Sequence, residues 1–184
     1  SIKKNNINKF IINDFIFINM GFKSYFIKKG THRSGFFLSL YLKIISSKYE
    51  IMFLDNCFYK LGDVDDFDIN KLFGISFGLH HDNSMRFGWN IDGDKIAIHA
   101  YYYKLGVRFM NKLISINTNE VYTFEIKVHD NFFELSIINK NNQLINTVNI
   151  AKAKTVNWGY RLFPYFGGNK CAPHDMEIKM KKIN

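Results

Sequence analysis

The segment spanning residues 80–103 carries the side chains best suited to chemistry on a ligand. Two alternating runs flank Asp92-Gly93, a dipeptide that favours a tight turn with positive φ, so the segment predicts one β-hairpin. If the strands pair around this dipeptide, Arg86 lies opposite His99, and Tyr101 follows on the same face. We therefore expect one face of the hairpin to be polar and to bind a ligand.

The opposite face of the predicted hairpin is apolar. The expected pairing places Trp89 opposite Ile96, Phe87 opposite Ile98 and Met85 opposite Ala100. Because side chains alternate between the two faces of a strand, a slip of one residue would mix the apolar and polar sets. The pattern thus predicts that the apolar face packs into the core while the polar face points away from it.

The polar face combines a guanidinium, an imidazole and phenols. Arg86 offers a planar fork to a carboxylate, sulfate or phosphate. Tyr101 and Tyr103 offer flat rings that carry a hydroxyl. With His99, these groups suit a sugar or nucleotide that bears negative charge. The alternative is that the tyrosines only pack beneath covering loops.

Four further side chains are secondary candidates for the same site. Alternation in the run 160–166 places two of them on one side, which we expect to belong to the same sheet face. Another follows a Gly-Gly pair and a proline, which restrict the backbone, although the same segment also fits an ordinary turn. The four are His81, Arg161, Tyr165 and His174.

No metal ion or cofactor is expected. Imidazoles and carboxylates near residues 80–82, 99 and 174–175 could gather, but the sequence lacks a spaced motif of the His-Glu-x-x-His kind. The acidic run 63–68 lacks the EF-hand pattern, and the basic stretch 28–35 lacks the P-loop spacing. Both stretches therefore predict exposed loops.

The 184 residues predict a single β-sandwich domain over 1–184, with 1–21 as an N-terminal extension or edge strand. Hydrophobic residues make up 47% of the chain and aromatic residues 17%, a composition that favours sheets. Only two prolines occur, and no linker divides the sequence. Because the chain starts at Ser1 and not at Met, a signal peptide or tag could already have been removed.

The formal net charge of +9 indicates a surface that attracts anions. The lysines are scattered and form no sustained basic run, which argues against nucleic acid as a partner. No apolar run is long enough for a membrane span. Cys57 and Cys171 do not fix the redox compartment. Localisation is open, with secretion or the cell surface favoured, and the oligomeric state is open too.

Short alternating runs with turn residues between them follow one another along the chain. We expect a hairpin from 36–45 and 49–58, further strands at 122–128, 132–138, 160–166 and 176–180, and a short helical turn within 64–72. The final strand, over 175–182, should pair with an early one. The fold class predicted is all-β, an antiparallel β-sandwich of jelly-roll type.

This strand rhythm, over about Phe22 to Met180, resembles the concanavalin A-like lectin and glucanase superfamily. That resemblance implies polar and aromatic side chains on the concave face of one sheet. The run Tyr102-Tyr103-Lys104-Leu105-Gly106-Val107 also resembles the aromatic-aromatic-Lys-x-Gly-Val strand of the alginate-lyase-like jelly rolls. In that family the strand lies near the C-terminus, and its companion Gln-x-His strand is not evident in this chain.

Together, these features predict a carbohydrate-binding, lectin-like module for an anionic glycan. One alternative is a polysaccharide lyase acting on uronates, in which Arg86 neutralises the carboxylate, His99 is the base and Tyr101 the acid. No pair of carboxyls on the hairpin supports a glycosidase. A second alternative is a nucleotide-sequestering protein of phage or defence type, which would use the same chemistry.

Overall fold

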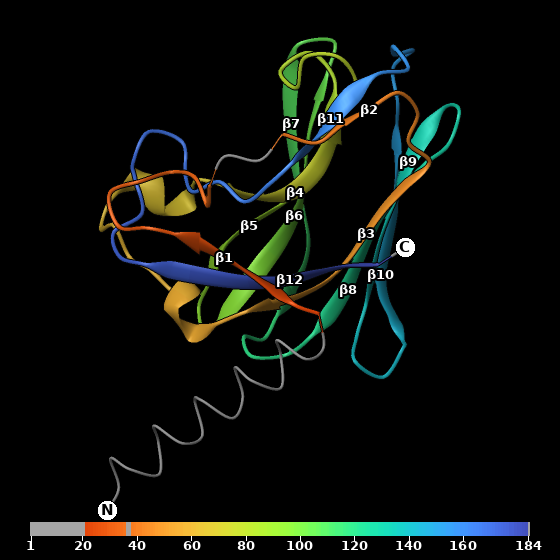
Figure 1. The fold of residues 1–184 in the computed structure, drawn as a ribbon. Coiled ribbons are helices and arrows are strands. Elements are labelled where there is room, and N and C mark those ends of the chain that lie inside the picture. Colours follow the sequence, from red (N-terminus) through yellow and green to blue (C-terminus); the bar gives the residue numbers. More distant parts are fainter. Residues whose placement is uncertain (1–20, 36–37, 184) are drawn as a thin grey trace, which may run out of the picture.

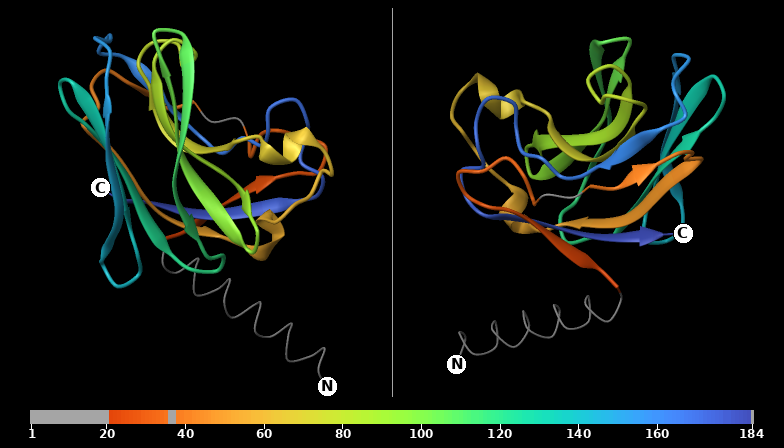
Figure 2. Two further views of the ribbon diagram at one scale, coloured as in Figure 1. Left: turned by 180° about the vertical axis from the view of Figure 1, so that it is seen from behind. Right: turned by 45° about the horizontal axis from the view of Figure 1, so that its top comes forward.

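The computed structural model describes residues 21–35 and 38–183, which form two six-stranded antiparallel sheets packed face to face (Figures 1 and 2). The N-terminal extension or edge strand expected up to residue 21 falls almost wholly outside these residues. In spatial order, the first sheet contains β1 (Lys23–Ile27), β12 (Met176–Ile183), β3 (Ser46–Phe53), β8 (Tyr122–Val128), β9 (Phe132–Ile138) and β10 (Leu144–Ala151).

The second sheet positions the candidate site. In spatial order it contains β2 (Leu40–Tyr41), β11 (Gly159–Leu162), β4 (Asn70–Ser76), β5 (Ser84–Asp92), β6 (Lys95–Lys104) and β7 (Val107–Ile116). Two short 3-10 helices, η1 (Asp55–Cys57) and η2 (Val64–Phe67), lie between β3 and β4. The predicted antiparallel sandwich is confirmed, and the last strand does pair with early ones, because β12 lies between β1 and β3.

The core lies between the sheets and is rich in aromatic rings. Trp89 and Phe87 of β5 meet Phe53 of β3 and Phe124 of β8, with ring centroids 5.3 Å and 5.1 Å apart. All four side chains are buried. Because these contacts join the apolar face of the β5–β6 hairpin to the opposite sheet, the other face of that hairpin points away from the core between the sheets. The side chains of Arg86, His99 and Tyr101 on that face are nevertheless buried.

Two expectations about the elements need correction, whereas the short helical turn expected within 64–72 is confirmed by η2. The predicted hairpin of 36–45 and 49–58 does not form, because β2 pairs with β11 in one sheet while β3 belongs to the other. The strand expected over 160–166 ends at Leu162, since Pro164 lacks the N–H that would continue the ladder. The strands at 122–128 and 132–138 are confirmed with the expected bounds.

The register of the β5–β6 hairpin differs from the expected one by two residues. Asp92 pairs with Lys95, so the turn is Gly93-Asp94, with Gly93 at φ +64°. The carboxylate of Asp92 accepts hydrogen bonds from Lys112 Nζ and Ser115 Oγ of β7, which keeps Asp92 within the strand. A shift of two residues preserves both faces, so the apolar and polar sets remain as predicted.

The corrected register changes which residues are opposite each other. Arg86 faces Tyr101 and not His99, while His99 faces Gly88. On the apolar side, Trp89 now faces Ile98. The polar partners on the outward face are therefore a guanidinium and a phenol.

Candidate functional site

The outward face of the second sheet gathers cations and phenols from five segments of the chain. We call this set the tyrosine face. It consists of Lys71, Arg86, His99, Tyr101, Tyr103, Arg108, Tyr160 and Tyr165. Strands β4, β5, β6 and β7 lie side by side in this order beneath it, with β11 beside β4 (Figure 1).

Arg86 is the buried centre of the tyrosine face, with only 8% of its surface exposed. Its cross-strand partner on the β4 side is Gly74, where an added Cβ would lie 2.6 Å from Arg86 Cγ. The stem of Arg86 therefore occupies space that a side chain at position 74 would need. Nη2 donates to the carbonyl oxygen of Phe163 at 3.3 Å. In the part of the chain that the structure describes, Nε has no hydrogen-bond partner.

Among the described residues, the groups that act on the charge of Arg86 are phenols. Burial is the main cause that lowers its pKa, to about 10, and the other contributing groups are Tyr101, Tyr160, Tyr103 and Tyr165. The guanidinium stays charged at neutral pH. A buried cation without a carboxylate partner is costly, and an anionic ligand would supply the missing charge.

Lys71 is a second cation on this face that sequence reasoning missed. Its Nζ donates to the carbonyl oxygen of Gly167 at 2.6 Å and lies 5.3 Å from the ring centroid of Tyr101 and 5.6 Å from that of Tyr165. Burial first, and then the charge of Arg86, lower the pKa of Lys71 to about 8. The signal in the sequence was a lysine directly before the apolar run 72–75 of β4.

Arg108 approaches the same tyrosines from β7, where it lies opposite Tyr103. Burial and a hydrogen bond with Tyr103 raise the pKa of the Tyr101 phenol, and a hydrogen bond with Arg108 opposes them. The charge of Arg108 also contributes to the lowered pKa of Lys71. Three cations therefore converge on Tyr101.

A histidine and a tyrosine form a hydrogen-bonded pair at the edge of the site. His80 Nδ1 lies 2.6 Å from Tyr160 Oη, and burial lowers the pKa of His80 to about 4, so this imidazole is neutral at pH 7. The neighbouring ring of His81, which was a sequence candidate, meets the ring of Tyr103 edge-on at 5.1 Å. His81 is exposed and lies at the rim of the tyrosine face.

His99 shares the outward face with Arg86 but has its own partner. Its Nε2 lies 2.8 Å from Asn90 Oδ1. Burial, and then the charge of Lys112, lower the pKa of His99 to about 4. The expectation that His99 faces Arg86 across the hairpin is wrong.

Arg161 and Tyr165 were expected on one face of the sheet; the structure places them on different faces, although both line the cleft beside Arg86. Tyr165 forms isolated bridges with Arg33 and Lys71 and lies on the tyrosine face. Arg161 instead lies opposite the core residue Ile75, and its Nη1 donates to Ser47 Oγ of the other sheet at 3.4 Å. The alternation breaks because β11 ends before Pro164. Arg161 thus points between the sheets.

A cleft of about 280 Å³ opens beside Arg86. Its lining includes the His80–Tyr160 pair, Tyr165 and the exposed Arg33. Counting Arg86 and Arg161, three arginines and two tyrosines line this cleft. The cleft is therefore suited to an acidic group attached to a polar molecule.

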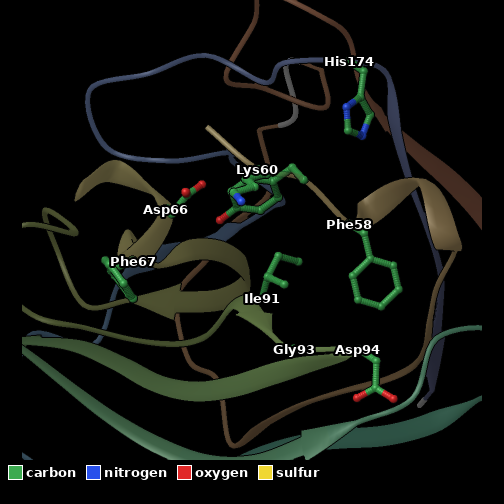
Figure 3. A pocket seen from close by; sticks show the side chains of 9 residues that line it. Phe58, Lys60, Asp66, Phe67, Ile91, Gly93, Asp94 and His174 are labelled. Carbon is green, nitrogen blue, oxygen red and sulfur yellow. The ribbon is translucent and has the colours of Figure 1, made fainter. Parts of the chain in front are cut away.

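A larger cleft, of about 830 Å³, lies at the Gly93-Asp94 end of the β5–β6 hairpin, away from His80 and Tyr103 at the other end. Figure 3 shows its apolar side chains, among them Phe58 and Ile91. His174 belongs to this cleft, where its Nε2 lies 3.0 Å from the carbonyl oxygen of Asn56. His174 therefore does not join the tyrosine face, which corrects its expected place.

The described residues, 21–35 and 38–183, contain no group of three or more side chains that could hold a metal ion. None of the helices within this part of the chain is long and apolar enough to cross a membrane. Cys57 and Cys171 are both free thiols.

No protein-family model and no curated protein matches the chain. Among solved structures, a functionally unknown protein from Saccharomyces cerevisiae is similar, with a TM-score of 0.58, 8% identity and coverage of 88% of this chain and 85% of that one. An alginate lyase from Klebsiella pneumoniae is similar with a TM-score of 0.52, 7% identity and coverage of 78% of this chain and 57% of the lyase. These likenesses concern the fold alone, a sandwich of two antiparallel sheets.

Proposed function

We propose that this protein binds an anionic glycan on the tyrosine face. The observation that carries the proposal is Arg86, a buried guanidinium at the wall of a cleft, whose Nε has no hydrogen-bond partner among residues 21–35 and 38–183. A carboxylate or sulfate on a sugar would accept hydrogen bonds from it and would compensate its charge.

The groups around Arg86 suit the rest of a sugar. Tyr160 and Tyr165 are half-buried, so each presents part of its ring and its hydroxyl to the cleft. Such rings contact the C–H groups of a sugar, while phenol and guanidinium groups hydrogen-bond its hydroxyls. The fold shared with an alginate lyase adds a precedent for a carbohydrate on this type of sandwich.

Calorimetric titration of the protein with uronate oligosaccharides, sulfated oligosaccharides and uncharged analogues tests the proposal. We expect an acidic series to bind and the uncharged series of equal length to bind at least tenfold more weakly, which corresponds to about 1.4 kcal/mol. Arg86→Ala should abolish binding, and Arg86→Lys should recover only part of it, because an ammonium lacks the planar fork.

The matched control is Lys140→Ala, which removes one positive charge from the β9–β10 turn of the other sheet. Equal losses in Lys140→Ala and Arg86→Ala would mean that binding follows net charge and not this site. Failure of every acidic glycan to bind would refute the proposed function.

A uronate lyase is the second candidate, favoured by the hydrogen bond between His80 and Tyr160 beside Arg86. Arg86 would bind the carboxylate, and neutral His80 would take the proton from the adjacent carbon. Tyr160 would protonate the leaving glycosidic oxygen as the carbon–carbon double bond forms. This pair replaces His99 and Tyr101 in the roles expected from the sequence, since His99 is engaged by Asn90.

Turnover separates the two candidates. A lyase releases an unsaturated uronate, which is detected by its ultraviolet absorbance, and Tyr160→Phe would abolish that signal while retaining affinity. A binding module gives affinity without product. If nucleotides shift the melting temperature and glycans do not, the nucleotide-sequestering alternative replaces both.

A further inference from the structure

The loops at one end of the sandwich carry exposed apolar side chains. This end, at the top of Figure 1, holds the β2–β3, β4–β5, β8–β9 and β10–β11 loops and the β6–β7 turn. The apolar side chains in question are between 47% and 82% exposed. They are Leu42, Ile45, Leu79, Leu105, Val156 and Trp158. Exposed apolar side chains that gather in one region mark an interaction surface.

Backbone hydrogen bonds join these loops into one surface. Bonds of 2.8–2.9 Å link each loop to its neighbour. They run from Val128 N to the carbonyl oxygen of Ile45, from Lys152 N to that of Asn131, from Gly78 N to that of Trp158 and from Gly106 N to that of Asp82. The apolar side chains are therefore held in place before any partner arrives, and binding has little backbone to order.

A cleft of about 390 Å³ among the same loops is basic. Among the described residues that line it, Asp130 is the single carboxylate. The ammonium of one of its lysines, Lys152, lies 5.5 Å and 5.9 Å from the ring centroids of Phe77 and Phe133. The lysines of the cleft are Lys43, Lys152 and Lys154. We call these three lysines and the six apolar side chains the loop end.

The charge of the loop end is available to an external anion. Within residues 21–35 and 38–183, none of its three lysines lies within 4.0 Å of a carboxylate oxygen, whereas Lys48, Lys127 and Lys181 of the first sheet each do. Lys43 and Lys154 are also exposed. The loop end thus combines apolar side chains with positive charge that has no internal partner in the described part of the chain.

We infer that the loop end docks the protein on a phospholipid bilayer with anionic headgroups. The lysines meet the headgroup phosphates, and the aliphatic side chains enter the boundary between headgroups and acyl chains. Trp158 suits the same boundary, because its ring is apolar and its N–H is polar. The inference is independent of the proposed function, since the cleft beside Arg86 shares no lining residue with the basic cleft.

The mixture of side chains favours a bilayer over two other partners. A nucleic acid would also attract the lysines, but it binds through stacking on aromatic rings, and all the apolar side chains here except Trp158 are aliphatic. A second copy of the chain would bring the same lysines face to face, which opposes association. An anionic bilayer complements both the charge and the aliphatic groups.

Vesicle sedimentation tests the inference. We expect vesicles of phosphatidylcholine with phosphatidylglycerol to bind the protein at least about tenfold more tightly than vesicles of phosphatidylcholine alone. The emission of Trp158 should shift to shorter wavelength on binding. The other tryptophan, Trp89, is buried in the core and should not respond, so Trp158→Phe should remove the shift.

Variants separate charge from insertion. Lys43→Ala and Lys154→Ala should each weaken binding to the anionic vesicles about fivefold, which corresponds to about 1 kcal/mol for a lysine near such a surface. Leu42→Ser combined with Ile45→Ser should weaken it about tenfold or more, because less apolar surface is buried. Both side chains are more than two-thirds exposed, so the fold should tolerate these changes.

The matched controls lie at the opposite end of the sandwich. Lys140→Ala and Leu144→Ser remove an exposed lysine and an exposed leucine at the β9–β10 turn (Figure 1), and they should leave vesicle binding unchanged. Arg86→Ala should bind vesicles as the native protein does. Loss of glycan binding with vesicle binding retained would therefore refute the proposed function alone.

Four outcomes would overturn the inference. The first is that no vesicle binds the protein. The second is that the control variants weaken binding as much as the loop-end variants, which would assign it to net charge. The third is that the emission of Trp158 does not move and only the lysine variants weaken binding. The fourth is that an oligonucleotide binds and vesicles do not, or that Leu42→Ser with Ile45→Ser converts a dimer into a monomer while vesicles do not bind.

Discussion

Arg86 of β5 lies directly opposite Tyr101 of β6, so the buried guanidinium has a phenol as its cross-strand neighbour where an ordinary buried ion pair would have a carboxylate. Phenols stay neutral at physiological pH, and burial raises the pKa of Tyr101 further. Within the part of the chain that the structure describes, the charge of Arg86 therefore has no carboxylate to compensate it. This is a cost to the free protein that a bound anion would remove.

This cost can be measured with Arg86→Met, which keeps much of the arginine stem and removes the charge. We expect the melting temperature to stay the same or rise, because an unpaired buried charge is lost while apolar contacts over Gly74 remain. Anion binding should disappear. Thermal denaturation checks the first point and calorimetry the second. A melting temperature lowered as much as by a core truncation would show that Arg86 supports the fold instead.

Gly74→Ala should destabilise the protein by about 1–3 kcal/mol, the range of overpacked core sites. An added Cβ would lie 2.3 Å from the carbonyl oxygen of Met85 and 2.6 Å from Arg86 Cγ, and the first of these is backbone, which cannot move aside. Urea unfolding measures the change. Gly30→Ser is a comparison in which only the backbone conformation opposes the side chain, since φ is positive and no described atom lies within 4 Å of the added Cβ. If the two variants lose the same free energy of unfolding, lack of space at Gly74 does not explain the loss.

Stability should fall between pH 6.5 and about 4 because of two histidines. The pKa values of His80 and His99 are both lowered to about 4 in the native state. Between pH 6.5 and 4, the two imidazoles are therefore protonated in the unfolded chain but neutral in the native state, which favours unfolding. Their contribution to the free energy of unfolding is fully present above pH 6.5 and is lost as the pH falls to about 4. The carboxylates with lowered pKa, such as Asp55 and Asp175, act below this window.

A pH series of melting temperatures checks this prediction. His80→Asn combined with His99→Asn should flatten the curve between pH 6.5 and 4 while preserving its steep fall at lower pH. A double variant with an unchanged slope would assign the window to other groups.

The two thiols should react very differently. Cys57 is fully buried, and burial raises its pKa to about 12. Cys171 is partly exposed, and its Sγ lies 3.4 Å from His32 Nε2. We expect a thiol reagent to label one cysteine in the native protein and two after unfolding. Cys171→Ser should abolish the native reaction, and labelling that persists in this variant would mean that Cys57 is reached through local opening.

The two faces of the hairpin could be predicted from the sequence, but its register could not. Strict alternation assigns Arg86 and Tyr101 to the polar face whichever turn is used, because a shift of two residues leaves the faces unchanged. The choice between the two turns depends on Asp92, whose carboxylate is held by Lys112 and Ser115 of β7. Those contacts join distant positions, which local pattern does not reveal.

The same limit explains the residues that were missed or misplaced. In the sequence, Lys71 resembles any solvated lysine. Its role is visible only in the fold, where its ammonium lies over the rings of Tyr101 and Tyr165, which are remote in sequence. Arg161 was assigned by counting alternate residues through Pro164, where the strand had already ended. Sequence pattern is reliable within an uninterrupted strand and loses its meaning at a break.

The tyrosine face is completed late in folding, because its members come from remote parts of the chain. Lys71 of β4 is paired with Tyr165, and β5, β6 and β7 lie between them in the sequence. Contacts between such remote segments form after the long loops between them have closed. A chain that stops before Tyr165 would form the β5–β6 hairpin but not the complete tyrosine face, so anion binding on this face would report completion of the whole fold.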